Sequence, residues 1–176
     1  MYGRKRVAIL VDQDFEDIEL VEPLRALKEA GGKVTIIGND TNVVYKGKRS
    51  GTKVKADKAI TDVKATDFDV IIVPGGYAPD KMRLNSAMIN FVKKAKEQHK
   101  IIAAICHGPQ LLISADIVKG KRVTSWPSIA IDLKNAGAIW LDEPVVIDDS
   151  IITSRKPSDL PQFDKAIIEA MDEDLN

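Results

Sequence analysis

Short apolar runs that alternate with helical segments constrain the fold of this chain more than any other feature of the sequence. Each run is continuously apolar and rich in Val and Ile, and the four clearest span residues 7–11, 34–37, 70–73 and 101–105. Strands that are buried on both faces of a parallel sheet have this composition. We therefore expect an α/β fold with a mostly parallel sheet and helices on both of its faces.

The segments between these runs carry apolar residues at helical spacing. One such stripe lies within residues 18–27, where Pro23 should kink the helix, and a second lies within residues 88–95. Further along, the patterns predict an antiparallel excursion at 42–58, a helix at 129–136, a strand pair at 145–147 and 151–153, and a final helix at 161–171. Because no repeat or linker interrupts this order, we expect residues 1–176 to form a single domain.

The composition excludes several classes of function. Lys plus Arg equals Asp plus Glu at 26 each, which disfavours nucleic acid and anionic membrane surfaces as partners. Nothing approaches the roughly 18 consecutive apolar residues that a membrane span needs. A single cysteine cannot form a disulfide within the chain, so we expect a reducing, cytoplasmic location. One cysteine and two histidines without a ligand pattern make a poor metal site, and we expect neither metal nor cofactor.

That one cysteine, Cys106, lies where an apolar run ends abruptly in Cys-His-Gly-Pro. A helix that begins at this point places its unpaired N–H groups and positive dipole end beside the thiol, which favours the thiolate. Ala104 and Gly108 provide the small neighbours that a nucleophile elbow requires on either side, and the N–H of His107 is then an oxyanion donor. The alternative is a small buried hydrophobic residue. The elbow context favours a reactive site.

Ligands bind in a crevice beyond the carboxyl ends of parallel strands. Two other predicted strands end in residues that could line such a crevice together with Cys106. Gly75 and Gly76 follow the third strand, and we expect them to bring bare N–H groups close to a substrate. Glu16 follows the first strand. It could simply match the dipole of the next helix, but beside Cys106 it would be pushed toward its protonated form and hydrogen-bond the thiolate.

His107 is the candidate base for Cys106, although adjacent residues do not normally face each other. Only a sharp turn would let both side chains reach one crevice. As a base, His107 also needs an orienting partner, commonly a carboxylate, and no acid follows it closely in the sequence.

These residues, in this order, resemble the ThiJ/PfpI superfamily, and most closely its PfpI-type intracellular cysteine peptidases. The resemblance rests on Phe-Glu-Asp-Ile-Glu-Leu at 15–20, Pro-Gly-Gly at 74–76, Ala-Pro-Asp at 78–80, Arg-Leu-Asn at 83–85, Ala-Ile-Cys-His-Gly-Pro-Gln at 104–110, Thr-Ser-Trp-Pro at 124–127 and Thr-Ser-Arg at 153–155. The combination covers nearly the whole chain.

The resemblance implies a flavodoxin-like three-layer sandwich with Cys106 as nucleophile, Glu16 as its protonated partner, and the amides of Gly76 and His107 as oxyanion donors. It also implies that the acid completing the triad comes from an adjacent subunit, at the position of Asp80. Activity would then require a homo-oligomer, a dimer or a hexamer built from dimers. We predict that four residues form the oxyanion and substrate-binding part of the site: Gly75, Gly76, Trp126 and Arg155.

Three functions fit these residues. The first is an intracellular cysteine hydrolase of the peptidase type, in which Cys106 attacks a peptide carbonyl and His107 carries the proton. The second is a glutathione-independent glyoxalase or protein deglycase, in which Cys106 adds to methylglyoxal or its adducts. The third is a redox-sensing stress protein or chaperone without turnover. The glutaminase-type amidotransferases are disfavoured, because no histidine follows His107.

Overall fold

The structure is a computed structural model that describes residues 5–49 and 51–173. Its centre is a seven-stranded sheet in the order β10-β11-β7-β6-β1-β2-β5. These strands are β1 (Arg6–Leu10), β2 (Lys33–Gly38), β5 (Lys58–Ala59), β6 (Val70–Val73), β7 (Ile101–Ile105), β10 (Val145–Asp148) and β11 (Ile151–Ser154). Every neighbouring pair is parallel except β10 with β11. The prediction of a mostly parallel sheet is confirmed.

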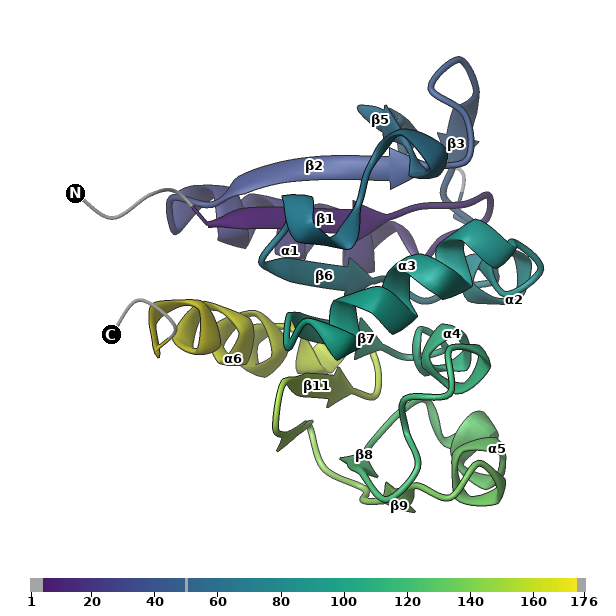
Figure 1. The fold of residues 1–176 in the computed structure, drawn as a ribbon, viewed down its shortest axis with the longest axis vertical. Helices are drawn as coiled ribbons and strands as arrows, with labels where there is room; N and C mark the ends of the chain where they lie inside the picture. The colour runs from purple at the N-terminus through teal and green to yellow at the C-terminus, as the bar shows by residue number, and fades with distance from the viewer. Residues whose placement is uncertain (1–4, 50, 174–176) are drawn as a thin grey trace.

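Helices cover both faces of this sheet (Figure 1). On one face, α1 (Asp17–Glu29) packs beside α6 (Leu160–Glu173). On the other, α3 (Ser86–Glu97) contacts α4 (Pro109–Ser114), which in turn contacts the short α2 (Ala78–Met82). This arrangement confirms the flavodoxin-like three-layer sandwich. Helix α1 runs through Pro23 without ending there.

Two small sheets stand outside the main one. β3 (Val44–Lys46) and β4 (Lys53–Lys55) form the antiparallel pair predicted at 42–58. β8 (Arg122–Val123) and β9 (Ile139–Trp140) pair in parallel beside α5 (Ala130–Asn135), near the lower end of the molecule in Figure 1. Strands of two residues are too short to show a periodic pattern, so β8 and β9 could not be predicted.

The core surrounds β7, whose five residues are all buried. Helices α3 and α6 approach this strand from opposite faces, and the small side chains of Ala103 and Ala104 leave room for them. Each fully buried Ile or Leu adds about 1.5–3 kcal/mol of transfer free energy. A strand under this constraint has little freedom to shift, so it holds the residue at its end in a fixed position.

The carboxyl ends of β1, β6 and β7 lie at the same edge of the sheet, because the three strands are adjacent and parallel. This edge is on the right of Figure 1, where the strand arrows point. The predicted site residues follow these three strands: Glu16 after β1, Gly75 and Gly76 after β6, and Cys106 and His107 after β7. Within the described part of the chain, no helix combines the length and apolar character needed to cross a bilayer.

Candidate active site

Cys106 occupies a strained turn between β7 and α4. Its φ is +63°, a left-handed conformation that residues other than glycine rarely adopt. The turn closes at once, because the N–H of Gly108 donates to the carbonyl of Ile105 at 2.8 Å. A Cβ on Gly108 would lie 2.4 Å from the carbonyl oxygen of Val73, so only glycine fits. This geometry confirms the predicted elbow.

Backbone hydrogen bonds fix the cysteine on both sides. The N–H of Cys106 donates to the carbonyl of Ser154 at 3.0 Å, and the carbonyl of Cys106 accepts from the N–H of Trp126 at 2.9 Å. The backbone N–H groups of His107 and Gly76 lower the pKa of the Cys106 thiol. The two amides expected to stabilise an oxyanion are therefore the two that act on the thiol.

The loop after β6 holds Gly76 in place. Gly76 has a φ of +83°, and a Cβ there would lie 2.4 Å from the backbone nitrogen of Glu16. The loop after β1 packs directly on it: the N–H of Glu16 donates to the carbonyl of Gly75 at 3.0 Å, and the N–H of Tyr77 donates to the carbonyl of Asp14 at 2.8 Å. The loops that follow β1, β6 and β7 therefore meet at Gly75, Gly76 and Cys106, as the sequence predicts.

The carboxyl group that adjoins Cys106 belongs to Glu19, in the first turn of α1. Glu19 is fully buried, and its Oε1 accepts the N–H of Gly75 at 2.9 Å. Its Oε2 has no hydrogen-bond partner of ordinary geometry among the described residues. Burial raises the pKa of Glu19 to about 8, and its interaction with the Cys106 side chain lowers that pKa only slightly. At neutral pH this acid keeps its proton, and Oε2 is the oxygen free to donate it toward the sulfur.

Glu16 is ionised, and the prediction that it is the protonated partner of Cys106 is wrong. Its Oε2 lies 2.8 Å from Nζ of Lys48, and its Oε1 accepts from Nε of Arg49 at 2.7 Å. Burial opposes the charge, but hydrogen bonds from these two cations outweigh it and lower the pKa of Glu16. Glu16 precedes α1, whereas Glu19 lies on the helix face that packs against the sheet.

The thiol is more basic than the elbow alone suggests. Burial raises the pKa of Cys106 to about 12, and the charge of an ionised Glu19 adds to this effect. The amides of His107 and Gly76 act in the opposite direction, as expected, but they do not outweigh burial. The prediction that the helix start and its N–H groups favour the thiolate is therefore wrong, because burial raises the thiol pKa more than these groups lower it. Because each charge disfavours the other, Glu19 and Cys106 titrate as a pair, and a proton on Glu19 removes the repulsion.

His107 lies within reach of the thiol. Its Nδ1 is 3.5 Å from Sγ of Cys106, so the left-handed turn does bring the adjacent side chains together. Burial lowers the pKa of His107, and the charge of Lys48 lowers it further, which leaves the imidazole neutral and able to accept a proton. Its Nε2 lies 3.4 Å from Oγ of Ser128. The sequence analysis did not anticipate Ser128, because nothing in the local pattern links it to His107.

The structure also shows the contacts of the three remaining predicted site residues. Asp80 is exposed on α2, and within the described residues its side chain forms no hydrogen bond or ion pair with His107. Trp126 is bonded to Cys106 through its backbone, and its side chain is 40% exposed. The guanidinium of Arg155 bonds the carboxylates of Asp159 and Asp142. Its predicted contact with substrate remains a prediction.

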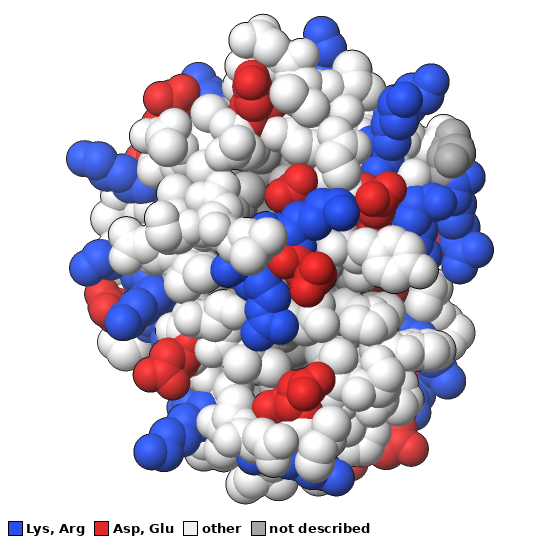
Figure 2. Space-filling view, turned by 90° about the vertical axis from the view of Figure 1, so that its right-hand side faces the viewer, with Lys and Arg blue, Asp and Glu red and all other residues white. Residues whose placement is uncertain are grey.

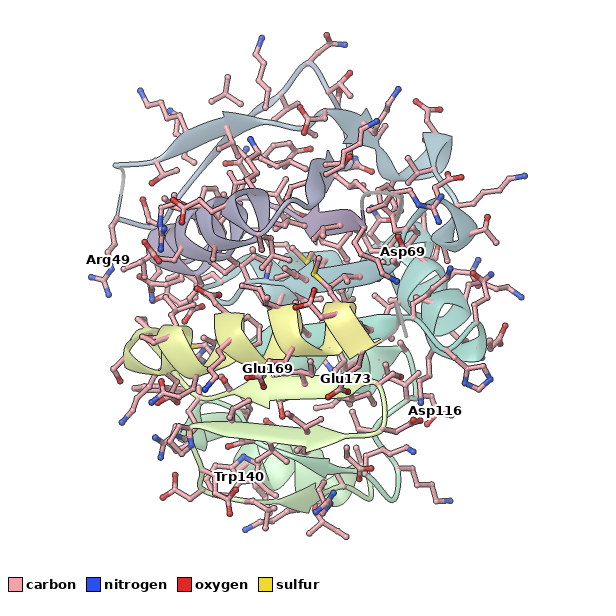
Figure 3. All side chains as sticks on the ribbon, turned by 90° about the vertical axis from the view of Figure 1, so that its left-hand side faces the viewer. Arg49, Asp69, Asp116, Trp140, Glu169 and Glu173 are labelled. Carbon is pink, nitrogen blue, oxygen red and sulfur yellow. The ribbon has the colours of Figure 1, made fainter. Side chains whose placement is uncertain are left out.

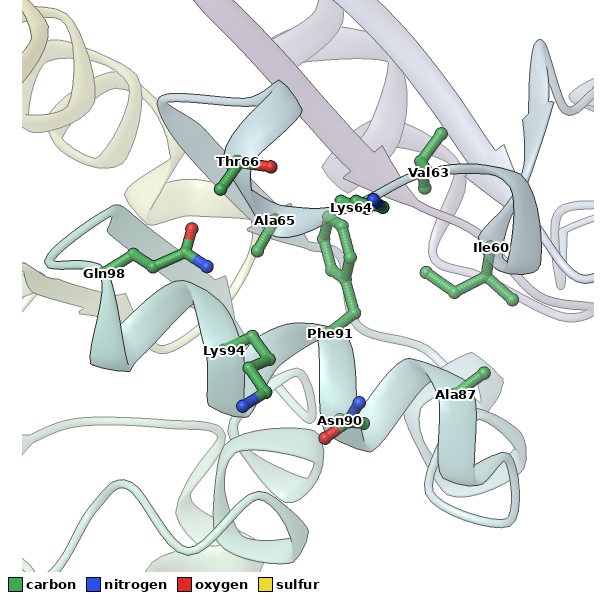
Figure 4. A pocket seen from close by; sticks show the side chains of 10 residues that line it. All are labelled: Ile60, Val63, Lys64, Ala65, Thr66, Ala87, Asn90, Phe91, Lys94 and Gln98. Atoms are coloured by element: carbon green, nitrogen blue, oxygen red, sulfur yellow. The ribbon is translucent and has the colours of Figure 1, made fainter.

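One cavity, of about 340 Å³, lies away from this centre (Figure 4). It separates α3 from the 3-10 turns η1 (Ile60–Asp62) and η2 (Ala65–Asp67). Phe91 projects between them, and Lys64 and Lys94 stand beside it. None of the predicted site residues lines this cavity. The predicted residues gather instead around Cys106, and we place the candidate active site there.

Known proteins of similar sequence and structure agree with the fold described above. The sequence pattern of the DJ-1/PfpI family matches residues 5–170. "Putative cysteine protease YraA" of Bacillus subtilis is 47% identical over 92% of this chain and 95% of its own length. "Protein/nucleic acid deglycase 2" of Escherichia coli is 41% identical over 92% of this chain and 94% of its own. The crystal structure of Drosophila melanogaster DJ-1beta superposes with a TM-score of 0.89 at 30% identity, covering 96% of this chain and 90% of that one.

Proposed function

Because this chain belongs to the DJ-1/PfpI family, we propose that it is a cysteine-dependent enzyme whose nucleophile is Cys106. The observation that carries the proposal is the convergence on one sulfur of a neutral imidazole, two backbone N–H groups and a protonated carboxyl group. Each of these groups has a part in nucleophilic addition to a carbonyl. A buried structural cysteine requires none of them.

The chemistry follows from this arrangement. As Sγ adds to a carbonyl carbon, the thiol proton passes to Nδ1 of His107, which lies 3.5 Å away. The electron pair of the carbonyl moves to its oxygen, where the N–H groups of Gly76 and His107 can receive the charge. Glu19 opposes the formation of thiolate when ionised and supports it when protonated. Its raised pKa therefore keeps the site in the productive state at neutral pH.

Small carbonyl compounds fit this site best. Cys106 is only 8% exposed, so a substrate must deliver its carbonyl into a narrow opening. An aldehyde such as methylglyoxal can do so, and its hemithioacetal with Cys106 rearranges through an enediol to a thioester that water hydrolyses to lactate. The relative that is named a deglycase supports this chemistry. We infer glyoxalase or deglycase activity as the primary function.

Hydrolysis of a peptide amide is the second candidate. It uses the same nucleophile and oxyanion donors, and one relative's name includes cysteine protease. An extended peptide has to approach past Trp126 and Tyr77, whose side chains are 40% and 63% exposed. This requirement favours the smaller substrates.

We also infer that the active form is a homo-oligomer in which Asp80 orients the His107 of a neighbouring subunit. Among residues 5–49 and 51–173, only the hydroxyl of Ser128 is within hydrogen-bond distance of Nε2 of His107. Asp80 is exposed on α2, and two large apolar side chains flank it in sequence, Tyr77 at 63% and Leu84 at 87% exposed. Exposed apolar side chains around an unpaired acid suit a contact with a second copy.

The test is a substrate panel. Wild-type protein and Cys106→Ala are incubated with methylglyoxal and, separately, with a peptide amide. Lactate formation that the substitution abolishes supports the primary function, and amide cleavage without lactate supports the second. If neither substrate turns over while peroxide oxidises Cys106 stoichiometrically, the protein is a redox sensor and the proposal fails.

A further inference from the structure

A chain of hydrogen bonds runs from the indole of Trp140 to the backbone of Cys106. Nε1–H of Trp140 donates to Oγ of Ser125 at 3.0 Å, and the hydroxyl of Ser125 donates to the carbonyl of Trp126 at 2.9 Å. The N–H of Trp126 donates in turn to the carbonyl of Cys106 at 2.9 Å. Ser125 is fully buried, so both bonds of its hydroxyl are made out of contact with bulk water. This one side chain therefore connects β9 with the elbow.

The same chain of bonds extends to the imidazole of the site. The carbonyl of Trp126 also accepts the N–H of Ile129 at 3.1 Å, which closes the 3-10 turn η3 (Pro127–Ile129). Ser128 lies in this turn, and its Oγ is 3.4 Å from Nε2 of His107. The backbone of Trp126 is therefore held by the elbow at its N–H and by the turn at its carbonyl.

The two-residue strands β8 and β9 place the indole that begins this chain. In their register Val123 lies opposite Trp140, and the N–H of Leu141 donates to the carbonyl of Val123 at 2.9 Å. From α5, Nζ of Lys134 lies 5.8 Å from the centroid of the Trp140 ring, a cation–π contact. Figure 3 shows Trp140 at the lower end of the molecule. Because Val123 is two residues before Ser125, the strand pair brings the indole to the serine hydroxyl.

Hydrogen bonds rather than ion pairs hold the segment of residues 123–141 against the sheet. The N–H of Thr124 donates to Oγ1 of Thr153 on β11 at 2.9 Å. Among the residues that the structure describes, the ion-paired residues nearest to this segment in sequence are Arg122 and Asp142. Uncharged atoms also make up most of the face onto which the carboxyl ends of the sheet open (Figure 2). The position of the segment therefore depends on neutral donors and acceptors.

We propose that Ser125 is a positioning residue of the candidate active site. It accepts the indole N–H and holds the backbone of Trp126 against the elbow, so that the turn η3 stays beside His107. This inference rests on the proposed function, in which the thiol proton passes from Sγ to Nδ1 of His107. For Nδ1 to accept that proton, Nε2 must carry the hydrogen of the neutral ring, and Oγ of Ser128 can accept it. The turn then fixes both the tautomer and the orientation of the base.

Two measurements on Ser125→Ala test this role. The chain has two histidines, so the Cε1–H signals of His107 and His99 can be followed separately by NMR as the pH is changed. Burial lowers the pKa of His107, and a loosened turn admits water, so we expect this pKa to rise toward its ordinary value. The His99 signal, from the opposite end of β7, should match that of wild type. We also expect kcat for lactate formation from methylglyoxal to fall about fivefold with little change in KM, as for the loss of one hydrogen bond.

Three further variants complete the experiment. Trp140→Phe keeps a ring but removes the indole N–H, and it should change both measurements in the same direction by less. Adding Trp140→Phe to Ser125→Ala should change neither measurement further, because Trp140 acts through Ser125. This double variant also removes the buried donor that Ser125→Ala leaves unpaired, which favours folding. Ser114→Ala is the matched control, since Oγ of Ser114 accepts Nε of Arg83 at 3.0 Å at the far end of α4.

The outcomes separate a positioning role from a structural one. Folded Ser125→Ala that loses stability to urea but keeps the His107 titration and kcat of wild type would overturn the proposal. Additive effects in the double variant, or equal changes in Ser114→Ala, would overturn it as well. Failure of the proposed function would look different: wild-type protein would turn over no carbonyl substrate, although the titration of His107 would still depend on Ser125.

Discussion

Glu19 and Cys106 face each other across the backbone of Gly75. The N–H of Gly75 donates to Oε1 of Glu19 at 2.9 Å, and a Cβ on Gly75 would lie 2.5 Å from that oxygen and 2.8 Å from Cβ of Cys106. When a buried acid and a buried thiol lie this close, ionising both requires a large free energy, because two negative charges then repel each other out of contact with water. The acid–base behaviour of the site is therefore a property of the pair.

The first prediction concerns this pair. Glu19→Gln replaces the O–H donor by a weaker amide donor, so the thiolate loses stabilisation at neutral pH. We expect iodoacetamide to alkylate Cys106 about fivefold more slowly at pH 7, which corresponds to about 1 kcal/mol. The matched control is Glu16→Gln, which removes the charge paired with Lys48 and should not slow alkylation. Slowing in Glu16→Gln alone would restore the original assignment of Glu16.

The second prediction concerns the loop after β6. Gly76→Ala introduces both a strained φ and a methyl group 2.4 Å from the nitrogen of Glu16, and we expect the free energy of unfolding to fall by about 3 kcal/mol or more. Gly31→Ala is the control, because Gly31 also has a positive φ, of +90°, but open space around it. That variant should lose about 1 kcal/mol, the strain alone. Equal losses in urea denaturation would show that the close approach at Gly76 is unimportant.

The third prediction concerns pH and the helix pair α1 and α6. Asp164 on α6 is 7% exposed, its Oδ1 has no hydrogen-bond partner among the described residues, and burial raises its pKa to about 7. The folded state therefore binds this proton more tightly than the unfolded state, in which the aspartate pKa has its ordinary value near 3.8. The resulting stability is complete below about pH 4 and is lost as pH rises toward 7.

Asp164→Asn should remove this loss. We expect the variant to gain, relative to wild type, on the order of 2 kcal/mol in free energy of unfolding between pH 5 and pH 8. Glu19, with its raised pKa, contributes a loss of the same sign that remains in the variant. Urea denaturation at the two pH values measures the difference. Identical pH slopes for both proteins would contradict the prediction.

The fourth prediction concerns the orientation of His107. If a neighbouring Asp80 holds the imidazole, Asp80→Ala should reduce turnover by orders of magnitude, whereas Ser128→Ala should reduce it only about threefold. Mixing Asp80→Ala with Cys106→Ala subunits should restore activity, because one subunit supplies the thiol and the other supplies the acid. A mixture that remains inactive although subunits exchange would place the acid elsewhere.

The sequence determined the fold well because β1, β2, β6 and β7 are buried on both faces and carry an unbroken apolar pattern. The short elements gave no comparable signal. Helix α2 spans only Ala78–Met82, and β8 and β9 have two residues each, so no period could be read from them.

The site was predicted in part. The tight turns at Cys106 and at Gly75-Gly76 could be predicted because they require small residues at particular positions, and those residues can be read from the sequence. Glu19 was missed, although it shares a helix face with the buried Leu20, Pro23 and Leu27, and an acid on an apolar stripe is an informative signal. The charge state of Glu16 depends on Lys48 and Arg49, which lie more than thirty residues away, and no local pattern reveals such a pairing.

The most direct test of the account is to trap the covalent intermediate. Wild-type protein is mixed with methylglyoxal, quenched in acid at successive times and analysed by mass spectrometry of the peptide that contains Cys106. The account predicts an adduct on Cys106 that forms and decays at the rate of lactate production, and neither adduct nor lactate with Cys106→Ala. Lactate production that persists in Cys106→Ala would contradict it.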